Sequence, residues 1–272
     1  MSDLQLIGKG RLADVFAWGD AQVLKLFAPG RDAAAIEAEA RASKIVLAAG
    51  VVTPATHGII EVEGRHGIVY DRALGVSMLG LLSAKPWKLV AFGRMLADLH
   101  VSIHRCPADD LPSQREQLER LIARAELPTA QRDLALARLC ELPEGTAICH
   151  GDFHPDNVLI NGDTATIIDW TTASIGNPAA DFALTSLILQ LGAPPPSSSL
   201  WTRIAIPVGR ALFFRSYASR YRKMRHLRPK DVQPWMLPIA VARLGYEIES
   251  ERDQLVTLIS QAVKSGSLRT SR

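Results

Sequence analysis

The 272-residue sequence has little cysteine and no long apolar run. Cys106, Cys140 and Cys149 are an odd number without C-x-x-C spacing, which argues against a disulfide framework or a cysteine zinc site. The longest strongly apolar stretches, such as residues 182–191, are well short of the ~20 residues that a membrane helix needs. The first residues lack the basic segment and the long apolar segment of a signal peptide. We therefore expect a protein of the reducing cytoplasm without a membrane partner.

An excess of charge of one sign is also missing. Lys and Arg number 31 against 28 Asp and Glu, a formal net charge of +3, and 47% of the residues are hydrophobic. These values are typical of a globular protein and exclude wholesale disorder and fibrous architectures. A chain of this length folds as one large domain or as two smaller ones.

The order of the predicted elements indicates two lobes. The first third is β-rich, with strands expected at residues 4–7, 14–18, 22–27, 58–61 and 66–70 and a helix from Asp32 to Ala49. Helical patterns follow at residues 89–104, 112–125 and 129–141, and again from Asp181 onward. The sequence therefore predicts an α+β protein with a small β-rich lobe, a larger helical lobe and a cleft between them.

The segment of residues 150–170 carries the clearest chemical signal. It contains the polar loop His150-Gly-Asp-Phe-His-Pro-Asp-Asn157 and then Ile167-Ile-Asp-Trp170. A hairpin that turns at residues 161–163 would bring Asp169 beside Asn157. Oxygen ligands from Asn and Asp suit a hard cation such as Mg²⁺, and Asp152 stays free to accept a proton from a hydroxyl. A metal clamp and a positioned base are the parts that phosphoryl transfer requires.

The pattern H-G-D-x-x-x-x-N followed by I-D-W resembles the signature of the aminoglycoside phosphotransferase and choline kinase family, small-molecule kinases with a protein-kinase-like fold. It also parallels the protein-kinase motifs H-R-D-x-x-x-x-N and D-F-G, with Gly151 in place of Arg and Trp170 in place of Phe. The resemblance implies that Asp152 is the catalytic base and that Asn157 and Asp169 are magnesium ligands.

Two features of the first lobe extend the resemblance to an ATP site. Residues 8–15, with Gly8, Gly10 and Val15, are similar to the kinase loop that covers the phosphates, although Ala13 stands in place of the third glycine. In the family, a lysine at the place of Lys25 binds the α- and β-phosphates of ATP and pairs with a helix glutamate.

Two glutamates of the expected helix are candidates for that pairing. We select Glu39, because it shares its helix face with Ile36 and Val46 and so points towards the packed side. Glu37 stays an alternative, although it lies four residues before Arg41 as in an ordinary solvated helix pair.

Residues 68–73 resemble the hinge between the lobes, where Asp71 and Ala73 would hold adenine. The resemblance covers about residues 5–185 and divides the chain into a nucleotide-binding lobe at residues 1–70, a hinge at 71–75 and a helical lobe at 76–272. It also implies that Asp181 braces the catalytic loop, whereas a plain helix cap is the alternative reading.

Other polar features have simpler explanations. His100 and His104 have metal-ligand spacing, but the glutamate of H-E-x-x-H is missing, so a structural role is favoured. His150 and His154 are expected to shape the loop around Asp152 rather than to bind zinc. Residues 215–230 hold seven basic and no acidic residues, but without a nucleic-acid motif we favour a solvated face or an anion-attracting patch. Residues 194–199 read as a surface loop and 264–272 as a frayed tail.

The combined interpretation is an ATP- and Mg²⁺-dependent phosphotransferase that acts on a hydroxyl of a small molecule, such as an aminoglycoside-like compound, an amino alcohol or another metabolite. The acidic candidates to receive a cationic acceptor are Glu247, Glu249 and Glu251. The sequence leaves the acceptor and the oligomeric state open.

Two alternatives fit the sequence less well than this interpretation. A protein kinase is disfavoured, because an A-P-E segment is absent and only about ten residues separate Trp170 from Asp181. A catalytically silent binding module is disfavoured, because Lys25, Asp152 and both proposed metal ligands are all present.

Overall fold

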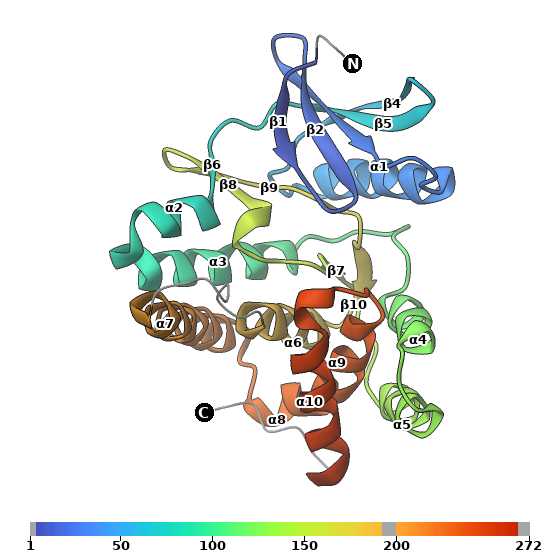
Figure 1. The fold of residues 1–272 in the computed structure, drawn as a ribbon, viewed down its shortest axis with the longest axis vertical. Coiled ribbons are helices and arrows are strands. Elements are labelled where there is room, and N and C mark those ends of the chain that lie inside the picture. The colour runs from blue at the N-terminus through green and yellow to red at the C-terminus, as the bar shows by residue number, and fades with distance from the viewer. Residues whose placement is uncertain (1–3, 192–199, 266–272) are drawn as a thin grey trace.

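The computed structural model describes residues 4–191 and 200–265. Five antiparallel strands form the upper lobe in Figure 1, in the order β1-β2-β3-β5-β4. Their bounds are β1 Leu6–Lys9, β2 Ala13–Trp18, β3 Gln22–Phe27, β4 Thr56–Val62 and β5 Arg65–Asp71. Helix α1, Ala33–Ala48, packs against this sheet. The predicted strand at residues 4–7 was placed two residues too early, because Gly8 and Lys9 still pair with Val15 and Asp14.

Helix α1 begins and ends where its sequence signals predict. The Asp32 carboxylate accepts the Ala34 backbone N–H at 3.1 Å, which satisfies a free donor of the first turn. Gly50 has φ +94°, a left-handed conformation that favours glycine and ends the helix. The buried face of α1 therefore faces the sheet, where Ile36 packs with Phe27 and Ile68.

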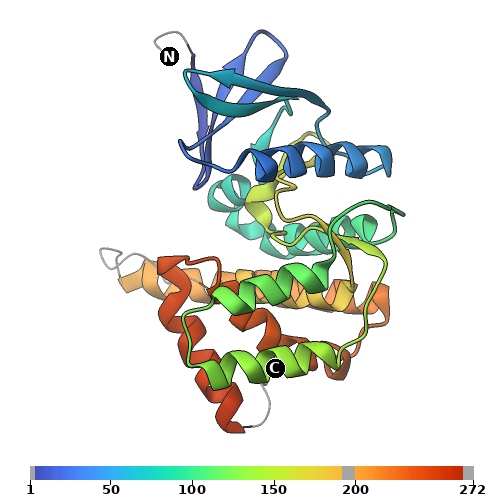
Figure 2. The same cartoon turned by 90° about the vertical axis from the view of Figure 1, so that its right-hand side faces the viewer.

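The larger lobe is built around helices that pack below the sheet. Helix α3 lies along α7 in the most extensive contact between two elements, and α6 is buried along most of its length. Helices α4 and α5 cover one side, as Figure 2 shows. The helices are α2 Met78–Ala84, α3 Leu89–Ile103, α4 Gln114–Arg124, α5 Thr129–Cys140, α6 Pro178–Gln190, α7 Leu200–Arg225, α8 Pro229–Val232, α9 Met236–Leu244 and α10 Glu249–Ser265. Single 3₁₀ turns lie at Pro86–Lys88, Pro155–Asn157 and Gln233–Trp235.

Two small sheets sit between the lobes and carry the polar segment of residues 150–170. One has the order β6-β8-β9, with strands Val76–Ser77, Val158–Asn161 and Thr164–Ile167. The other pairs β7, Ala147–Cys149, with β10, Ser174–Gly176. The predicted hairpin at residues 158–168 is β8–β9, and it runs across the space below the first lobe (Figure 1).

The predicted two-lobed α+β fold is confirmed, and the expectations for the chain end need one correction. Lys264 and Ser265 belong to helix α10 rather than to a frayed tail, because the amphipathic pattern that buries Leu255 and Ile259 continues to Ala262. The predicted loop at residues 194–199 and the last residues of the predicted tail, 266–272, lie outside the described residues. Within the described part of the chain, none of the helices has the length and apolarity needed to span a membrane.

Two helical glycines give a test of the α3–α7 packing. A Cβ on Gly93 of α3 would lie 2.7 Å from the Phe213 carbonyl oxygen of α7, whereas a Cβ on Gly209 would make an ordinary 3.5 Å contact with Leu89. We predict that Gly93→Ala lowers the free energy of unfolding by roughly 1–3 kcal/mol, because the helices must separate. The matched Gly209→Ala should leave it unchanged or raise it by up to ~1 kcal/mol. Urea unfolding measures both, and equal effects of the two variants would contradict the close approach.

Candidate active site

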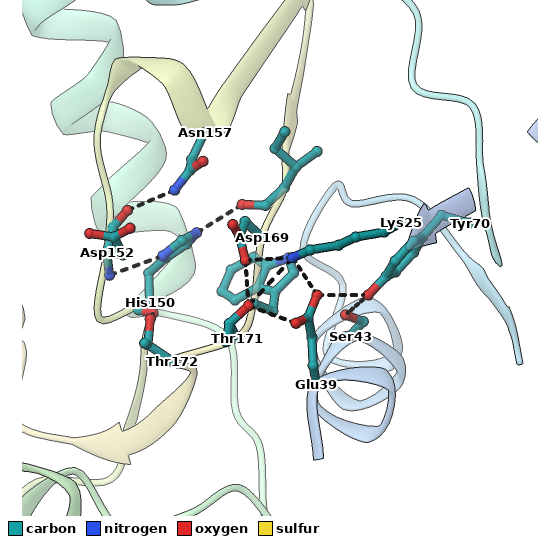
Figure 3. Close-up of polar contacts among 12 residues, drawn as sticks. Lys25, Glu39, Ser43, Tyr70, His150, Asp152, Asn157, Asp169, Thr171 and Thr172 are labelled. Atoms are coloured by element: carbon teal, nitrogen blue, oxygen red, sulfur yellow. Dashed lines mark hydrogen bonds and ion pairs between the residues drawn. The ribbon is translucent and has the colours of Figure 1, made fainter. Parts of the chain in front are cut away.

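The site is organised around the ammonium group of Lys25. Lys25 lies in β3, and its Nζ is 2.6 Å from Glu39 Oε1 of α1 and 3.0 Å from Asp169 Oδ1 of the helical lobe (Figure 3). Burial lowers the pKa of Lys25, but the neighbouring carboxylates Asp169 and Glu39 outweigh burial and the net pKa is raised. The lysine is therefore charged, and it joins the two lobes. Glu37, the alternative partner, is exposed.

Asp169 lies at the end of the β8–β9 hairpin in a strained backbone conformation, with φ +67°. Its contacts with Lys25 and with the Thr171 hydroxyl, at 2.6 Å, both use Oδ1, and the side chain is 40% exposed. Burial raises the pKa of Asp169, but Lys25 and the Thr171 hydrogen bond bring it down to about 2. Asp169 is therefore an ionised carboxylate, and its second oxygen, Oδ2, is turned away from the lysine.

Thr171 adds a hydroxyl to the ion-pair cluster. Its Oγ1 is 2.7 Å from Glu39 Oε2 and 3.4 Å from Lys25 Nζ, in addition to the contact with Asp169. Tyr70 donates from the other side to Glu39 Oε1 at 3.2 Å. Neither Thr171 nor Tyr70 is among the site residues predicted from the sequence. The position of Thr171 directly after the I-D-W motif was a signal that could have found it.

The hairpin brings the two predicted metal-ligating residues to the same end. Val158 pairs with Ile167, and the Ile168 N–H donates to the Asn157 carbonyl at 3.0 Å, so Asn157 and Asp169 are close to each other in space. The Asn157 side-chain nitrogen donates to the Asp152 carbonyl at 2.9 Å, which directs its amide oxygen away from that carbonyl. The Asn157 oxygen and Asp169 Oδ2 are hard oxygen donors, the type of ligand that suits Mg²⁺, so the residues present fit a divalent cation.

His150 ties the predicted catalytic loop, residues 150–157, to the strand that precedes Asp169. Its Nδ1 accepts the Asp152 N–H at 3.3 Å and its Nε2 donates to the Ile168 carbonyl at 3.1 Å (Figure 3). Burial lowers the pKa of His150, so the ring is neutral, as this donor and acceptor pattern requires. The next residue, Gly151, has φ +77°, and a Cβ there would lie 2.6 Å from the Thr172 carbonyl oxygen, so the loop needs glycine.

A buried cluster beneath the loop holds its backbone. The Asp181 carboxylate accepts the N–H groups of His150 at 2.7 Å and Gly151 at 3.0 Å. The Nε2 atoms of His100 and His104 donate to the same carboxylate, at 3.0 and 3.2 Å. Asp181 thus contacts the loop backbone as the resemblance implies, and the alternative reading of Asp181 as a helix cap is wrong, because α6 begins at Pro178 and the Asn177 side chain caps it.

Two tyrosines of α7 complete the cluster. The Tyr217 hydroxyl is 2.7 Å from His100 Nδ1, and the Tyr221 hydroxyl is 2.7 Å from His104 Nδ1. The three residues His100, His104 and Asp181 have the donor types of a metal site. However, each of their ligand atoms already takes part in a hydrogen bond, so the structural role predicted for the two histidines accounts for the arrangement.

Asp152 lies beside this framework with both carboxylate oxygens near a partner. Oδ1 is 3.1 Å from Arg243 Nη1 of α9, and Oδ2 is 3.5 Å from His154 Nε2. Burial raises the pKa of Asp152, but His154 and Arg243 outweigh it and the net pKa is lowered. Asp152 is therefore ionised and able to accept a proton. Arg243 was not found from the sequence, because it lies 91 residues away and outside any motif.

A cavity of about 430 Å³ opens next to the Lys25 cluster, between the lobes. Most of the predicted nucleotide-binding residues line it, together with one predicted metal-ligating residue: Gly8, Val15, Lys25, Glu39, Asp71, Ala73 and Asp169. Gly10 lies outside the lining, in a tight turn where its N–H donates to the Ala13 carbonyl at 2.9 Å. Asn157 and Asp152 are also outside the lining. The structure thus brings the predicted phosphate loop, lysine and hinge to one cavity, with the catalytic loop adjacent.

The His100 cluster makes the stability of the protein depend on pH. Burial lowers the pKa of His100 to about 4, whereas an unfolded histidine titrates near 6.5. Between these values the unfolded state binds a proton that the folded state does not, so the free energy of unfolding falls as the pH falls. From pH 7 to pH 5 we predict a loss of about 2 kcal/mol from this residue. Urea unfolding at both pH values measures it, and a His100→Gln variant with an undiminished pH dependence would contradict the assignment.

Comparisons with known proteins identify the family of the chain. A profile of the phosphotransferase enzyme family matches residues 3–227. An uncharacterized protein of Bacillus subtilis, YcbJ, is 43% identical over 44 residues, which span 15% of this chain and 14% of that protein.

Solved kinases share the fold at low sequence identity. An amicoumacin kinase in complex with AMP-PNP, Ca²⁺ and Ami superimposes with a TM-score of 0.64 at 13% identity, over 100% of this chain and 91% of its own. A type VIII aminoglycoside-3'-phosphotransferase gives 0.58 at 20% identity, over 90% and 93%. A choline/ethanolamine kinase family protein from Mesorhizobium loti gives 0.55 at 18%, over 96% and 80%. The chain therefore belongs to the phosphotransferase enzyme family, as the resemblance of residues 150–170 to aminoglycoside phosphotransferases and choline kinases implies.

Proposed function

We propose that the protein uses ATP and Mg²⁺ to phosphorylate a hydroxyl group of a small molecule, and that it works in the cytoplasm, where ATP is supplied. The observation that carries this proposal is the meeting of Lys25, Glu39 and Asp169 at one wall of an interlobe cavity, with the carboxylate of Asp152 on the adjoining loop. Three separate segments of the chain contribute these charges. Such convergence is expected of a site for a polyanion and its cation.

The lining of the cavity suits a nucleotide. The backbone from Tyr70 to Gly75 would hold the base, with Asp71 and Ala73 at the predicted contact positions. Gly8 and Val15 lie over the cavity on the β1–β2 hairpin, where backbone N–H groups can reach phosphate oxygens. Lys25, which Glu39 holds in place, would bind the α- and β-phosphates through its ammonium group.

Asn157 and Asp169 would hold Mg²⁺, which neutralises charge on the transferring phosphoryl group when it is bound. Oδ2 of Asp169 takes no part in the contacts with Lys25 and Thr171, so it is the atom that would be available to the metal. Asp152 would orient the acceptor hydroxyl and take its proton as the oxygen–phosphorus bond forms. The fixed backbone of the loop, tied through His150 and Asp181, supplies the positioning on which such a reaction depends.

The relatives and the short loop after Asp169 support a small acceptor. The fold neighbours are described as kinases of amicoumacin and aminoglycosides and as a choline/ethanolamine kinase family protein, and one was solved with AMP-PNP and Ca²⁺. Only residues 171–177 separate Trp170 from α6, and residues 174–176 of these are strand β10. This leaves no space for the long activation loop of a protein kinase.

Replacing the carboxylate of Asp152 tests its proposed role as the catalytic base. We predict that Asp152→Asn lowers kcat by roughly 10²- to 10⁴-fold, because the amide cannot accept the proton, while ATP binding is retained. A screen of aminoglycosides, amino alcohols, sugars and nucleosides with γ-labelled ATP first identifies an acceptor, and the same assay measures the variant. Asp156→Asn in the same loop is the matched control, since Asp156 is exposed. Normal turnover by Asp152→Asn would remove Asp152 from this role.

Removing the carboxylate of Asp169 tests the metal site. Asp169→Ala should abolish the strengthening of ATP binding by Mg²⁺, because the variant lacks one of the two proposed ligands. Calorimetric titration with ATP, with and without Mg²⁺, measures the effect. Asp163→Ala, at the exposed turn of the same hairpin, should bind like the wild type. An unchanged Mg²⁺ dependence in Asp169→Ala would contradict the metal assignment.

A further inference from the structure

The guanidinium group of Arg243 connects the proposed base to the last helix of the described chain. Its Nη1 is 3.1 Å from Asp152 Oδ1, while Nε and Nη2 are 2.7 and 2.8 Å from the two carboxylate oxygens of Glu251. The Arg243 side chain is only 7% exposed and that of Glu251 13%. Arg243 is on α9 and Glu251 in the first turn of α10, so one planar group links two helices to the catalytic loop.

We propose that Arg243 is a positioning residue that fixes the Asp152 carboxylate through Oδ1 and leaves Oδ2 to receive the proton of the acceptor hydroxyl. This inference rests on the proposed function. A bidentate contact such as that between Arg243 and Glu251 fixes the orientation of the guanidinium plane, whereas a single hydrogen bond leaves the plane free to rotate. Glu251 therefore fixes Arg243, and Arg243 in turn fixes the rotamer of Asp152. His154, near Oδ2, is the more exposed neighbour, with 26% of its side chain accessible.

The charges of the three groups support a role in catalysis beyond joining helices. A buried arginine paired with Asp152 alone would neutralise the base and weaken its attraction for a proton. Glu251 supplies a second carboxylate, so the trio of Asp152, Arg243 and Glu251 keeps a net charge of one negative. Burying an unpaired Arg243 or Glu251 would cost much free energy, so both groups stay paired. The arrangement therefore holds the Asp152 carboxylate in place while its negative charge is kept.

The turn between α9 and α10 also contacts the loop that would cover the phosphates. The Tyr246 ring is 5.5 Å from the Arg243 guanidinium, and the Tyr246 carbonyl accepts Arg11 Nη1 of the β1–β2 loop at 3.1 Å. The turn between α9 and α10 therefore sits between the phosphate-covering loop and Asp152. Glu251 is already paired with Arg243 and is not available to a cationic acceptor, whereas Glu247 and Glu249 of the same segment are exposed.

The test compares Arg243→Met and Glu251→Gln with a structural arginine of the same lobe. Arg115 is the control, because its guanidinium bonds the Leu139 and Leu142 carbonyls and Glu144 without touching the catalytic loop. The readout is Mg·ATP hydrolysis with water as acceptor, measured as released phosphate, together with the KM for ATP. Asp152→Asn supplies the baseline of an enzyme without its base.

We expect Arg243→Met to lower kcat by roughly 10- to 100-fold with the KM for ATP within about two-fold, because only the base is misplaced. Glu251→Gln should lower kcat by a smaller factor than Arg243→Met. Arg243→Lys should recover part of the rate, and millimolar guanidinium should partly rescue Arg243→Ala. Arg115→Met should lower the melting temperature but leave kcat unchanged.

Three outcomes overturn the inference, and they are distinguishable. If the wild type hydrolyses ATP, Asp152→Asn does not, and Arg243→Met is as active as the wild type, Arg243 has no positioning role and the proposed function stands. If the wild type and Asp152→Asn release phosphate equally, the proposed base fails, and this inference fails with it. If kcat is low in Arg243→Met, is not restored in Arg243→Lys, and is not rescued by guanidinium in Arg243→Ala, the variants have lost structure alone, which also contradicts the proposal.

Discussion

The ion pair between Lys25 and Asp169 is the interaction on which the rest of the site depends. It is the point where the sheet lobe and the helical lobe meet through opposite charges, 144 residues apart in the chain. Glu39 holds the lysine from helix α1, and the β8–β9 hairpin presents the aspartate from below. Because each carboxylate raises the pKa of the ammonium and the ammonium lowers that of Asp169, both groups stay charged in a partly buried place. A polyanion with a divalent cation can replace this contact without leaving either charge unpaired.

A second constraint keeps the catalytic loop in place from below. Asp181 is fully buried, and burial raises its pKa, but hydrogen bonds from His100 and His104 help to hold it well below the usual value. The charge is satisfied by four N–H groups, two of them from the backbone of the loop itself. Helices α3, α6 and α7 thus act on Asp152 through a chain of hydrogen bonds rather than through direct contact. The helical core therefore holds the loop of Asp152 in place, with only residues 171–177 between Trp170 and α6.

Local patterns predicted much of this site, and long-range contacts account for what they missed. The H-G-D-x-x-x-x-N motif and the alternation of β3 are short-range signals, and the helix face of Glu39 distinguished it from Glu37. Strands β6, β7 and β10 have only two or three residues each, too few for a periodic pattern. Tyr217 and Arg243 act through partners 117 and 91 residues away, so only the packing of α7 and α9 reveals them. Ala13, which stands in place of the third glycine of the kinase loop, packs with Phe27 in the sheet core. This contact also depends on the folded sheet, so the local pattern did not reveal it.

The most direct measurement of the central claim is the position of the metal in a crystal grown with a non-hydrolysable ATP analogue and Mn²⁺ in place of Mg²⁺. Anomalous scattering locates manganese independently of the surrounding atoms. Our account predicts a peak at coordination distance from the Asn157 amide oxygen and Asp169 Oδ2, with Lys25 Nζ against the α- and β-phosphates. A nucleotide bound outside the interlobe cavity, or a metal held without Asn157 and Asp169, would contradict it.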